Sequence, residues 1–208
     1  MLDGWRSWNA RSFQLDEMGV ATSNLARAVA QQADDTFKEA DTALLGIFER
    51  VEVDGIGPTS IRRLHGVLVM RRQELQQLDG LAVYDEKGNW LVTTTSTPLK
   101  RFNNSDREYF AFHRQHPDSG PHIGVPIISR SSGKWVIPVS RRINKPDGSF
   151  DGVVLATIKI AFFKDFYESL QIGNAGAVAL VLDNGVMLLR RPCDETTIGK
   201  SILVSRHA

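Results

Sequence analysis

Cysteine, charge imbalance and long apolar runs are all scarce in this sequence of 208 residues. Cys193 is the single cysteine, so no disulfide framework can form within the chain. The 25 Lys and Arg residues nearly balance the 24 Asp and Glu residues, for a formal net charge of +1. That balance excludes the strong positive field typical of nucleic-acid-binding proteins. With 42% hydrophobic and 24% charged residues, the composition predicts a globular chain of one or two domains.

The sequence also lacks a segment that could cross a membrane, which would need about 20 consecutive apolar residues. The uncharged stretch Ser169–Leu182 has 14 residues and includes the polar Gln171. Asp3, Arg6 and Arg11 stand where a signal peptide would be apolar. We therefore expect any membrane anchor to lie in segments absent from this chain.

The first quarter of the chain predicts one long amphipathic helix over residues 1–50. No proline occurs between Leu2 and Val51, and apolar or small residues recur at steps of three and four. A single small core cannot bury such a helix, so it is expected to run along more than one unit or to project as a stalk. The Gly and Pro residues of segment 54–58 end it. The positions that define the apolar face are Leu15, Met18, Thr22, Leu25, Val29, Ala33, Phe37, Ala40, Leu44 and Ile47.

The rest of the chain predicts an α+β fold built on a five-stranded antiparallel sheet. Two β-rich runs flank a glycine-bearing turn, as in a hairpin. A short helix is expected to be capped at Ser105 or Asp106. A Lys-Pro-Asp-Gly turn at 145–148 separates the last two strands. The predicted strands are 81–85, 90–95, 122–129, 135–143 and 152–160, and the predicted helices are 59–78, 106–115 and 162–170.

An internal repeat gives the domain organisation. The pattern of apolar strand, Asp, Gly turn and second apolar strand occurs around Asp85 and again around Asp183, 98 residues later, and 25 residues follow Asp183. The sequence therefore predicts one complete module and the beginning of a second, truncated one. The alternative is that 177–189 is the last hairpin of a single domain. The predicted boundaries are 1–50 for the long helix, 51–161 for the first module, 162–174 for a connecting helix and 175–208 for the second module.

The order of these elements, and several short motifs within them, resemble a known family. The sequence is similar to the extracytoplasmic double-Cache sensor domains, also called PDC or PAS-like domains, of bacterial transmembrane receptors. Sensors that precede GGDEF diguanylate cyclases are the most similar, followed by those of some histidine kinases. The motifs that show the resemblance are Asp106-Arg107-Glu108-Tyr109-Phe110, Ile123-Gly124-Val125-Pro126, Gly133-Lys134-Trp135-Val136-Ile137, Ser140-Arg141-Arg142-Ile143, the segment Asp147–Val153 and Leu188-Leu189-Arg190-Arg191-Pro192.

The resemblance implies a periplasmic sensor with a PAS-like membrane-distal module, followed by the start of a membrane-proximal one. It implies transmembrane helices outside this chain and a cytoplasmic output domain, for which we rank diguanylate cyclase before histidine kinase. The heptad-like helix spacing suggests a homodimer in the intact receptor. A ligand-free dimerisation module of a histidine kinase or chemoreceptor is the alternative function, and a small-molecule enzyme on a PAS-like scaffold is a second.

The resemblance also implies a ligand site in the distal module, for a carboxylate or an amino acid. Segment 100–145 contains nine Lys or Arg against three Asp or Glu, a net charge of +6. Arginine suits a carboxylate because its planar guanidinium donates two parallel hydrogen bonds. We expect Arg107 and Tyr109 from the covering helix, and Trp135 and Arg141 from one face of a strand, to contact the ligand. Asp151 is the candidate partner of a ligand ammonium.

No catalytic or cofactor site is expected. The sequence has no Gly-x-Ser-x-Gly elbow and no phosphate-binding loop, so the chain is predicted not to be an enzyme. His113, His116, Asp118 and His122 suggest a zinc site, but Pro117 ends their helix and exposed imidazoles need no metal. The prediction is therefore no metal and no cofactor.

Overall fold

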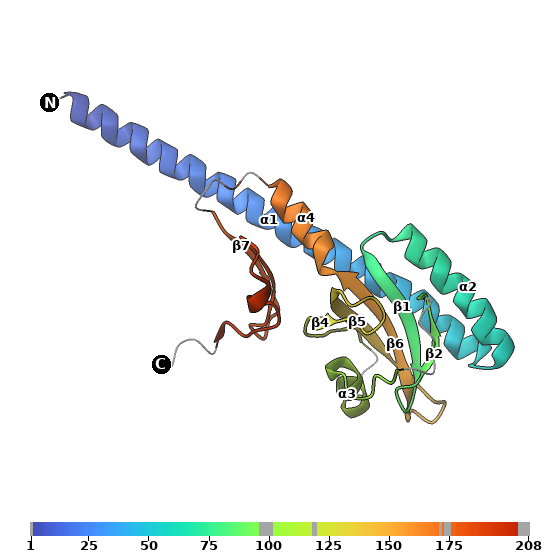
Figure 1. The fold of residues 1–208 in the computed structure, drawn as a ribbon. Helices are drawn as coiled ribbons and strands as arrows, with labels where there is room; N and C mark the ends of the chain where they lie inside the picture. The colour runs from blue at the N-terminus through green and yellow to red at the C-terminus, as the bar shows by residue number, and fades with distance from the viewer. Residues whose placement is uncertain (1, 96–101, 118–119, 171, 173–175, 204–208) are drawn as a thin grey trace. The chain divides into compact units, whose positions relative to one another are not determined.

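The long N-terminal helix is confirmed and runs slightly further than the sequence predicts. Helix α1 spans Leu2–Asp54 in the computed structural model (Figure 1). Gly55 follows it with φ of 64° and donates its amide to the carbonyl of Val51, a geometry that favours glycine and stops the helix. The structure describes residues 2–95, 102–117, 120–170, 172 and 176–203, with side chains from residue 22 onward.

The chain divides into two compact units, Met1–Thr36 and Phe37–Ala208. In the described part of the first unit the chain is entirely helical. Its side chains bond along the helix: Gln31 donates to the carboxylate of Asp35 at 2.8 Å, and the Thr36 hydroxyl donates to the carbonyl of Gln32 at 2.7 Å. The second unit contains the remaining part of α1, all strands and the other helices.

An antiparallel sheet forms the centre of the second unit, as predicted. Its order is β2-β1-β6-β5-β3, with β4 also paired to β5. The predicted turn at 145–148 joins β5 to β6, with Gly148 at φ of 82° and its amide bonded to the carbonyl of Lys145. The elements are α2 (Pro58–Glu74), β1 (Leu78–Asp85), β2 (Trp90–Thr93), α3 (Glu108–Gln115), β3 (His122–Ile123), β4 (Ile127–Ile128), β5 (Trp135–Asn144), β6 (Phe150–Lys159) and α4 (Ile160–Ser169).

The predicted strand 122–129 is wrong as one continuous element, because it forms the two short strands β3 and β4. Strand β3 pairs with Val139 and Ser140, and β4 pairs with Trp135 and Val136. The interruption contains Pro126 and faces Pro138, whose ring nitrogen has no hydrogen to donate to the sheet. The two prolines therefore explain why this edge is split.

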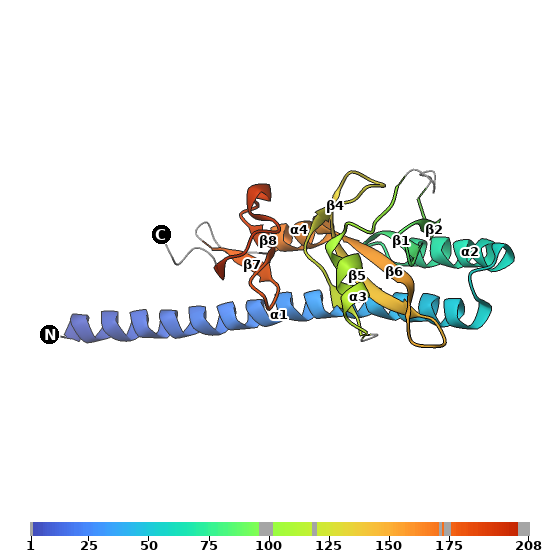
Figure 2. The same cartoon turned by 90° about the horizontal axis from the view of Figure 1, so that it is seen from below.

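Helices cover one face of the sheet, and α3 with the loops around it covers the other (Figures 1 and 2). On the first face, α2 packs on β1 and β2, and α1 is bonded to β5 through Asp41. On the second face, α3 packs on β5 and β6. A core cluster on that second face consists of Ala82, Tyr84, Trp90, Tyr109, Phe110, Val153 and Leu155.

The internal repeat of the sequence is also a repeat of turn geometry. Gly88 and Gly185 both have φ of 81°, and each donates its amide to a carbonyl three residues earlier. Strands β7 (Val178–Val181) and β8 (Met187–Arg191) form a second, two-stranded sheet. The short 3₁₀ helix η2 (Glu195–Thr197) follows. Within the described ranges, no helix is both long and apolar enough to pass through a bilayer.

Candidate ligand-binding pocket

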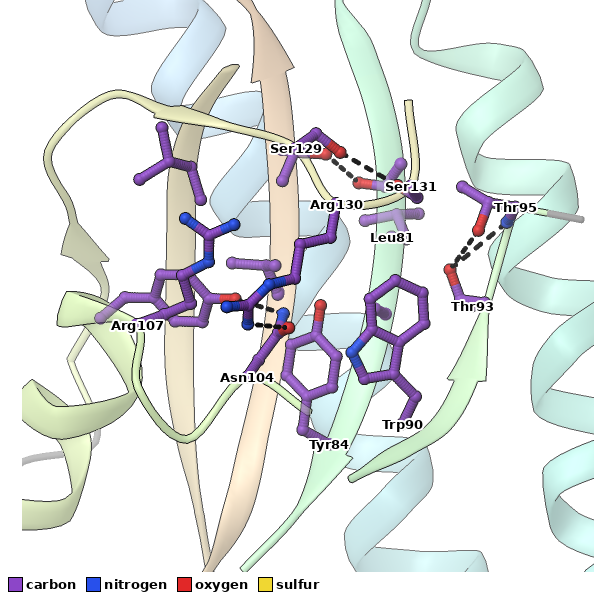
Figure 3. Close-up of a pocket in the computed structure, with 16 residues that line it drawn as sticks. Leu81, Tyr84, Trp90, Thr93, Thr95, Asn104, Arg107, Ser129, Arg130 and Ser131 are labelled. Carbon is purple, nitrogen blue, oxygen red and sulfur yellow. Dashed lines mark hydrogen bonds between the residues drawn. The ribbon is translucent and has the colours of Figure 1, made fainter. Parts of the chain in front are cut away.

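A pocket lies between the α3-side face of the sheet and the segments that cover it (Figure 3). It is partly open to solvent, and its roughly 400 Å³ of empty space includes that open solvent. Its floor comes from β1, β2 and β6, and its cover comes from residues 104–109 and the loop between β4 and β5. The described lining residues are Gly80, Leu81, Ala82, Tyr84, Trp90, Thr93, Thr95, Asn104, Arg107, Tyr109, Ile127, Ser129, Arg130, Ser131, Leu155 and Thr157.

Aromatic side chains with polar ends form the inner wall. The Asn104 amide donates to the Tyr109 hydroxyl at 2.8 Å, and Tyr84 lies in the same core cluster. Burial raises the pKa of Tyr109 to about 12 and raises that of Tyr84 well above its usual range. Both phenols are therefore neutral at physiological pH. Trp90 is 7% exposed, and its indole Nε1 has no hydrogen-bond partner.

Two arginines line the pocket, and they differ in how many of their hydrogen-bond donors are already used. Arg130 makes four hydrogen bonds: two parallel ones to the Asp106 carboxylate at 2.6 and 2.8 Å, one to the Asn103 carbonyl at 2.5 Å and one to Asn104 Oδ1 at 3.0 Å. Arg107 donates from Nη2 to the carbonyl of Ile128 at 3.1 Å, but its buried Nε has no partner. Arg107 therefore has an unused donor at the pocket, whereas the Arg130 guanidinium is already neutralised.

Asp106 fixes the loop over the pocket instead of capping α3. The predicted cap at Ser105 or Asp106 is wrong, because Arg107 occupies the N-cap position and no side chain caps the helix. The Arg130 guanidinium lowers the pKa of Asp106 to about 2, chiefly by hydrogen bonding. The carboxylate therefore stays ionised and ties residues 129–134, here called the Arg130 loop, to the segment before α3.

Asp106→Ala is expected to loosen the Arg130 loop with little change in global stability. The Asp106 side chain is 62% exposed, and an exposed ion pair contributes about 1 kcal/mol or less. Amide hydrogen exchange should speed up in residues 129–134 while the melting temperature stays nearly constant. Glu86→Ala, which breaks the exposed pair with Lys145, is the matched control and should leave that loop unchanged. Equal exchange in both variants would contradict this role of Asp106.

The five residues predicted to contact ligand are divided by the sheet. Arg107 and Tyr109 line the pocket. Arg141 pairs with Val154 of β6, and its side chain points to the other face of the sheet. There it donates two hydrogen bonds to Asp41 of α1 at 2.6 and 2.9 Å. Strand alternation places Trp135 on the same face as Arg141. Asp151 lies 4.0 Å from Lys145 Nζ, near the turn between β5 and β6. These last three are not among the residues described as lining the pocket.

Several polar residues of the described lining were not among the predicted contacts, and the largest of them are Tyr84, Trp90, Asn104 and Arg130. Tyr84 and Trp90 belong to the first copy of the internal repeat and face each other across the hairpin, so the repeat contained a signal for them. Asn104 and Arg130 lie in loops, where no periodicity marks a facing direction. Only the net positive charge of segment 100–145 indicated that Arg130 could be part of the site.

The histidines near α3 are all hydrogen-bonded to other protein groups. His122 Nε2 lies 2.8 Å from Glu108 Oε1, and His113 Nε2 lies 3.0 Å from the Ser140 hydroxyl. The Phe112 ring stacks on both His122 and His116. Asp118 lies outside the described residues. In the part of the chain that the structure describes, no three His, Cys, Asp or Glu side chains gather in a way that could hold a metal ion.

Several solved structures are similar to this chain in architecture. The extracellular domain of rpHK1S-Z16, a protein assigned as a histidine kinase, is 33% identical with a TM-score of 0.74, and the match covers 89% of this chain and 76% of that one. The ligand-binding domain of the Pseudomonas fluorescens chemoreceptor CtaA, in complex with L-isoleucine, is 16% identical with a TM-score of 0.61, covering 85% and 67%. That of the Pseudomonas aeruginosa amino acid chemoreceptor PctC, in complex with GABA, is 13% identical with a TM-score of 0.62, covering 83% and 77%.

The two chemoreceptor domains share the fold with this chain at low identity. No curated protein sequence matches the chain. The family model described as "Cache domain" matches residues 10–205, which is nearly the whole chain. The chain therefore belongs to the Cache-domain family, as a double-Cache sensor module and not an enzyme, of the kind found in the extracytoplasmic part of receptors.

Proposed function

We propose that this chain is the periplasmic ligand-sensing part of a transmembrane receptor, and that the pocket of the first module, residues 51–161, binds a small organic anion or amino acid. The observation that supports this most is the pair of unused, buried donors at the pocket, Arg107 Nε and Trp90 Nε1. A buried donor without a partner is costly, and a ligand oxygen would satisfy it. CtaA and PctC, whose structures hold L-isoleucine and GABA, support a small carboxylate-bearing ligand.

We further propose that strand β5 relays occupancy of the pocket to helix α1. Successive residues of β5 point to opposite faces of the sheet. Ser140 and Arg142 contact His113 of α3, while Arg141 between them bonds Asp41 of α1. A ligand with higher affinity for one of two placements of α3 would favour that placement. The change would shift strand β5 and thereby helix α1.

The receptor that contains this module is proposed to be a homodimer anchored by membrane segments outside this chain. The similarity to rpHK1S-Z16 favours a histidine kinase as the output domain, and a diguanylate cyclase is the alternative. A ligand-free dimerisation module remains the competing function, which the following experiment tests.

Arg107→Ala is expected to weaken ligand binding by about 10- to 100-fold, because a hydrogen bond from a charged donor contributes roughly 1.5–3 kcal/mol. The ligand is first found by a thermal-shift screen of carboxylates and amino acids, since a ligand that binds only the native state raises the melting temperature. Calorimetry then compares the variants. Arg114→Ala is the matched control, an exposed arginine on α3 that does not belong to the described lining. A screen in which nothing raises the melting temperature would favour the ligand-free module.

A further inference from the structure

We propose that the pocket selects carboxylates that lack an ammonium group over the corresponding α-amino acids, an inference that rests on the proposed ligand-sensing function. The described lining contains two arginines and no Asp or Glu. The segment 96–101, which follows the lining residue Thr95 in the chain, also has no acidic residue in its sequence. Among the described residues, the lining therefore offers a cation for a carboxylate and no anion for an ammonium.

The buried lining atoms that lack a hydrogen-bond partner are donors. Arg107 Nε and Trp90 Nε1 are both buried and both lack an acceptor. The two side chains approach the pocket from opposite sides (Figure 3). A carboxylate supplies acceptor oxygens, whereas an ammonium has three N–H groups and no lone pair. An ammonium would therefore add donors to a pocket whose donors are already in excess.

Most neutral side-chain oxygens of the described lining already have at least one hydrogen-bond partner in the protein. Asn104 Oδ1 accepts from Arg130, and the Tyr109 hydroxyl accepts from Asn104. The hydroxyls of Thr93 and Thr95 lie 3.3 Å apart, and those of Ser129 and Ser131 lie 3.0 Å apart. A ligand ammonium would therefore meet neutral oxygens, most of which already have a protein partner, and no carboxylate, in the described lining.

The nearby carboxylates are held by protein groups. Asp106 accepts two hydrogen bonds from Arg130, and Asp79 accepts one from the Ser132 hydroxyl at 2.7 Å. Asp151, which the sequence suggested for an ammonium, lies beside Lys145. A buried charge without a partner is strongly disfavoured, so amino acids should bind much more weakly than their ammonium-free counterparts.

Isothermal titration calorimetry with matched ligand pairs tests this selectivity. The pairs are L-valine with 3-methylbutanoate, L-alanine with L-lactate, and L-aspartate with succinate and L-malate. We expect at least one ammonium-free member to bind and its amino-acid counterpart to bind at least 50-fold more weakly. Thr95→Asp, which adds a carboxylate at the lining, should reduce this ratio at least tenfold.

The outcomes separate this inference from the function on which it rests. An amino acid that binds as tightly as its ammonium-free counterpart, or more tightly, would overturn the selectivity and leave the sensing function standing. The absence of binding by every member of every pair, together with a negative thermal-shift screen, would overturn both.

Discussion

Arg141→Ala is expected to lower the free energy of unfolding by about 2–3 kcal/mol, because it leaves the Asp41 carboxylate of α1 without its partner. The two side chains are only 14% and 23% exposed, and the guanidinium donates two hydrogen bonds to the carboxylate. For a chain of this size the melting temperature should fall by roughly 5–10 °C. Chemical denaturation of the purified domain measures the change.

A double-mutant cycle with Asp41→Ala isolates the pair. Each single variant removes one member of the Arg141–Asp41 ion pair, so the double variant should be less destabilised than the sum of the single ones by about 1 kcal/mol or more. Arg62→Ala, an exposed arginine of α2, is the control and should change stability by less than about 0.5 kcal/mol.

The Arg141→Ala variant also distinguishes the observed bond of Arg141 to Asp41 from its predicted role at the ligand. Ligand affinity should stay within about twofold of the wild type in Arg141→Ala, while Arg107→Ala weakens it. A loss of affinity in Arg141→Ala as large as that in Arg107→Ala would contradict the division of the two arginines between the faces of the sheet.

Sequence reasoning could not resolve to which face of the sheet the side chains of β5 point. Alternation correctly groups Trp135 with Arg141, since their separation is an even number of residues. It does not say whether that group faces α3 or α1, because both faces of this sheet are covered. The decisive partner, Asp41, is 100 residues away in the sequence. No local pattern marks a pairing over such a distance.

Elements with a local physical cause were predicted well. The end of α1 follows from Gly55, which adopts the left-handed conformation. The turn between β5 and β6 follows from Pro146-Asp147-Gly148. The absence of a side-chain cap on α3 was missed, because the Asp106 carboxylate has a stronger partner in Arg130, which lies in a distant loop. Local propensity was overridden there by a tertiary contact.

Acidification from pH 6.5 to 4 is expected to remove about 3 kcal/mol of stability through His113. This side chain is fully buried between α3 and β5, and burial lowers its pKa from 6.5 to about 4. The groups around it are Ser140, Arg142, Glu108 and His122, and the proximity of His122 lowers the pKa further. The folded protein therefore keeps His113 neutral while the unfolded chain takes up a proton.

The sign follows from that difference in proton uptake. A lowered folded-state pKa means that the contribution of His113 is complete above pH 6.5 and is lost as the pH falls toward 4. A pKa lowered from 6.5 to about 4 corresponds to about 3 kcal/mol of stability. Denaturation midpoints measured at several pH values should fall steeply over this window in the wild type.

His113→Gln separates this effect from the titration of carboxylates. Glutamine can still bond to the Ser140 hydroxyl but takes up no proton in this range, so the variant should have a flatter stability profile between pH 4 and 6.5. His116→Gln changes an exposed histidine of the same region and should keep the wild-type slope. If His113→Gln and the wild type lose equal stability on acidification, the loss must come from other groups, and the buried neutral imidazole contributes nothing to the pH dependence.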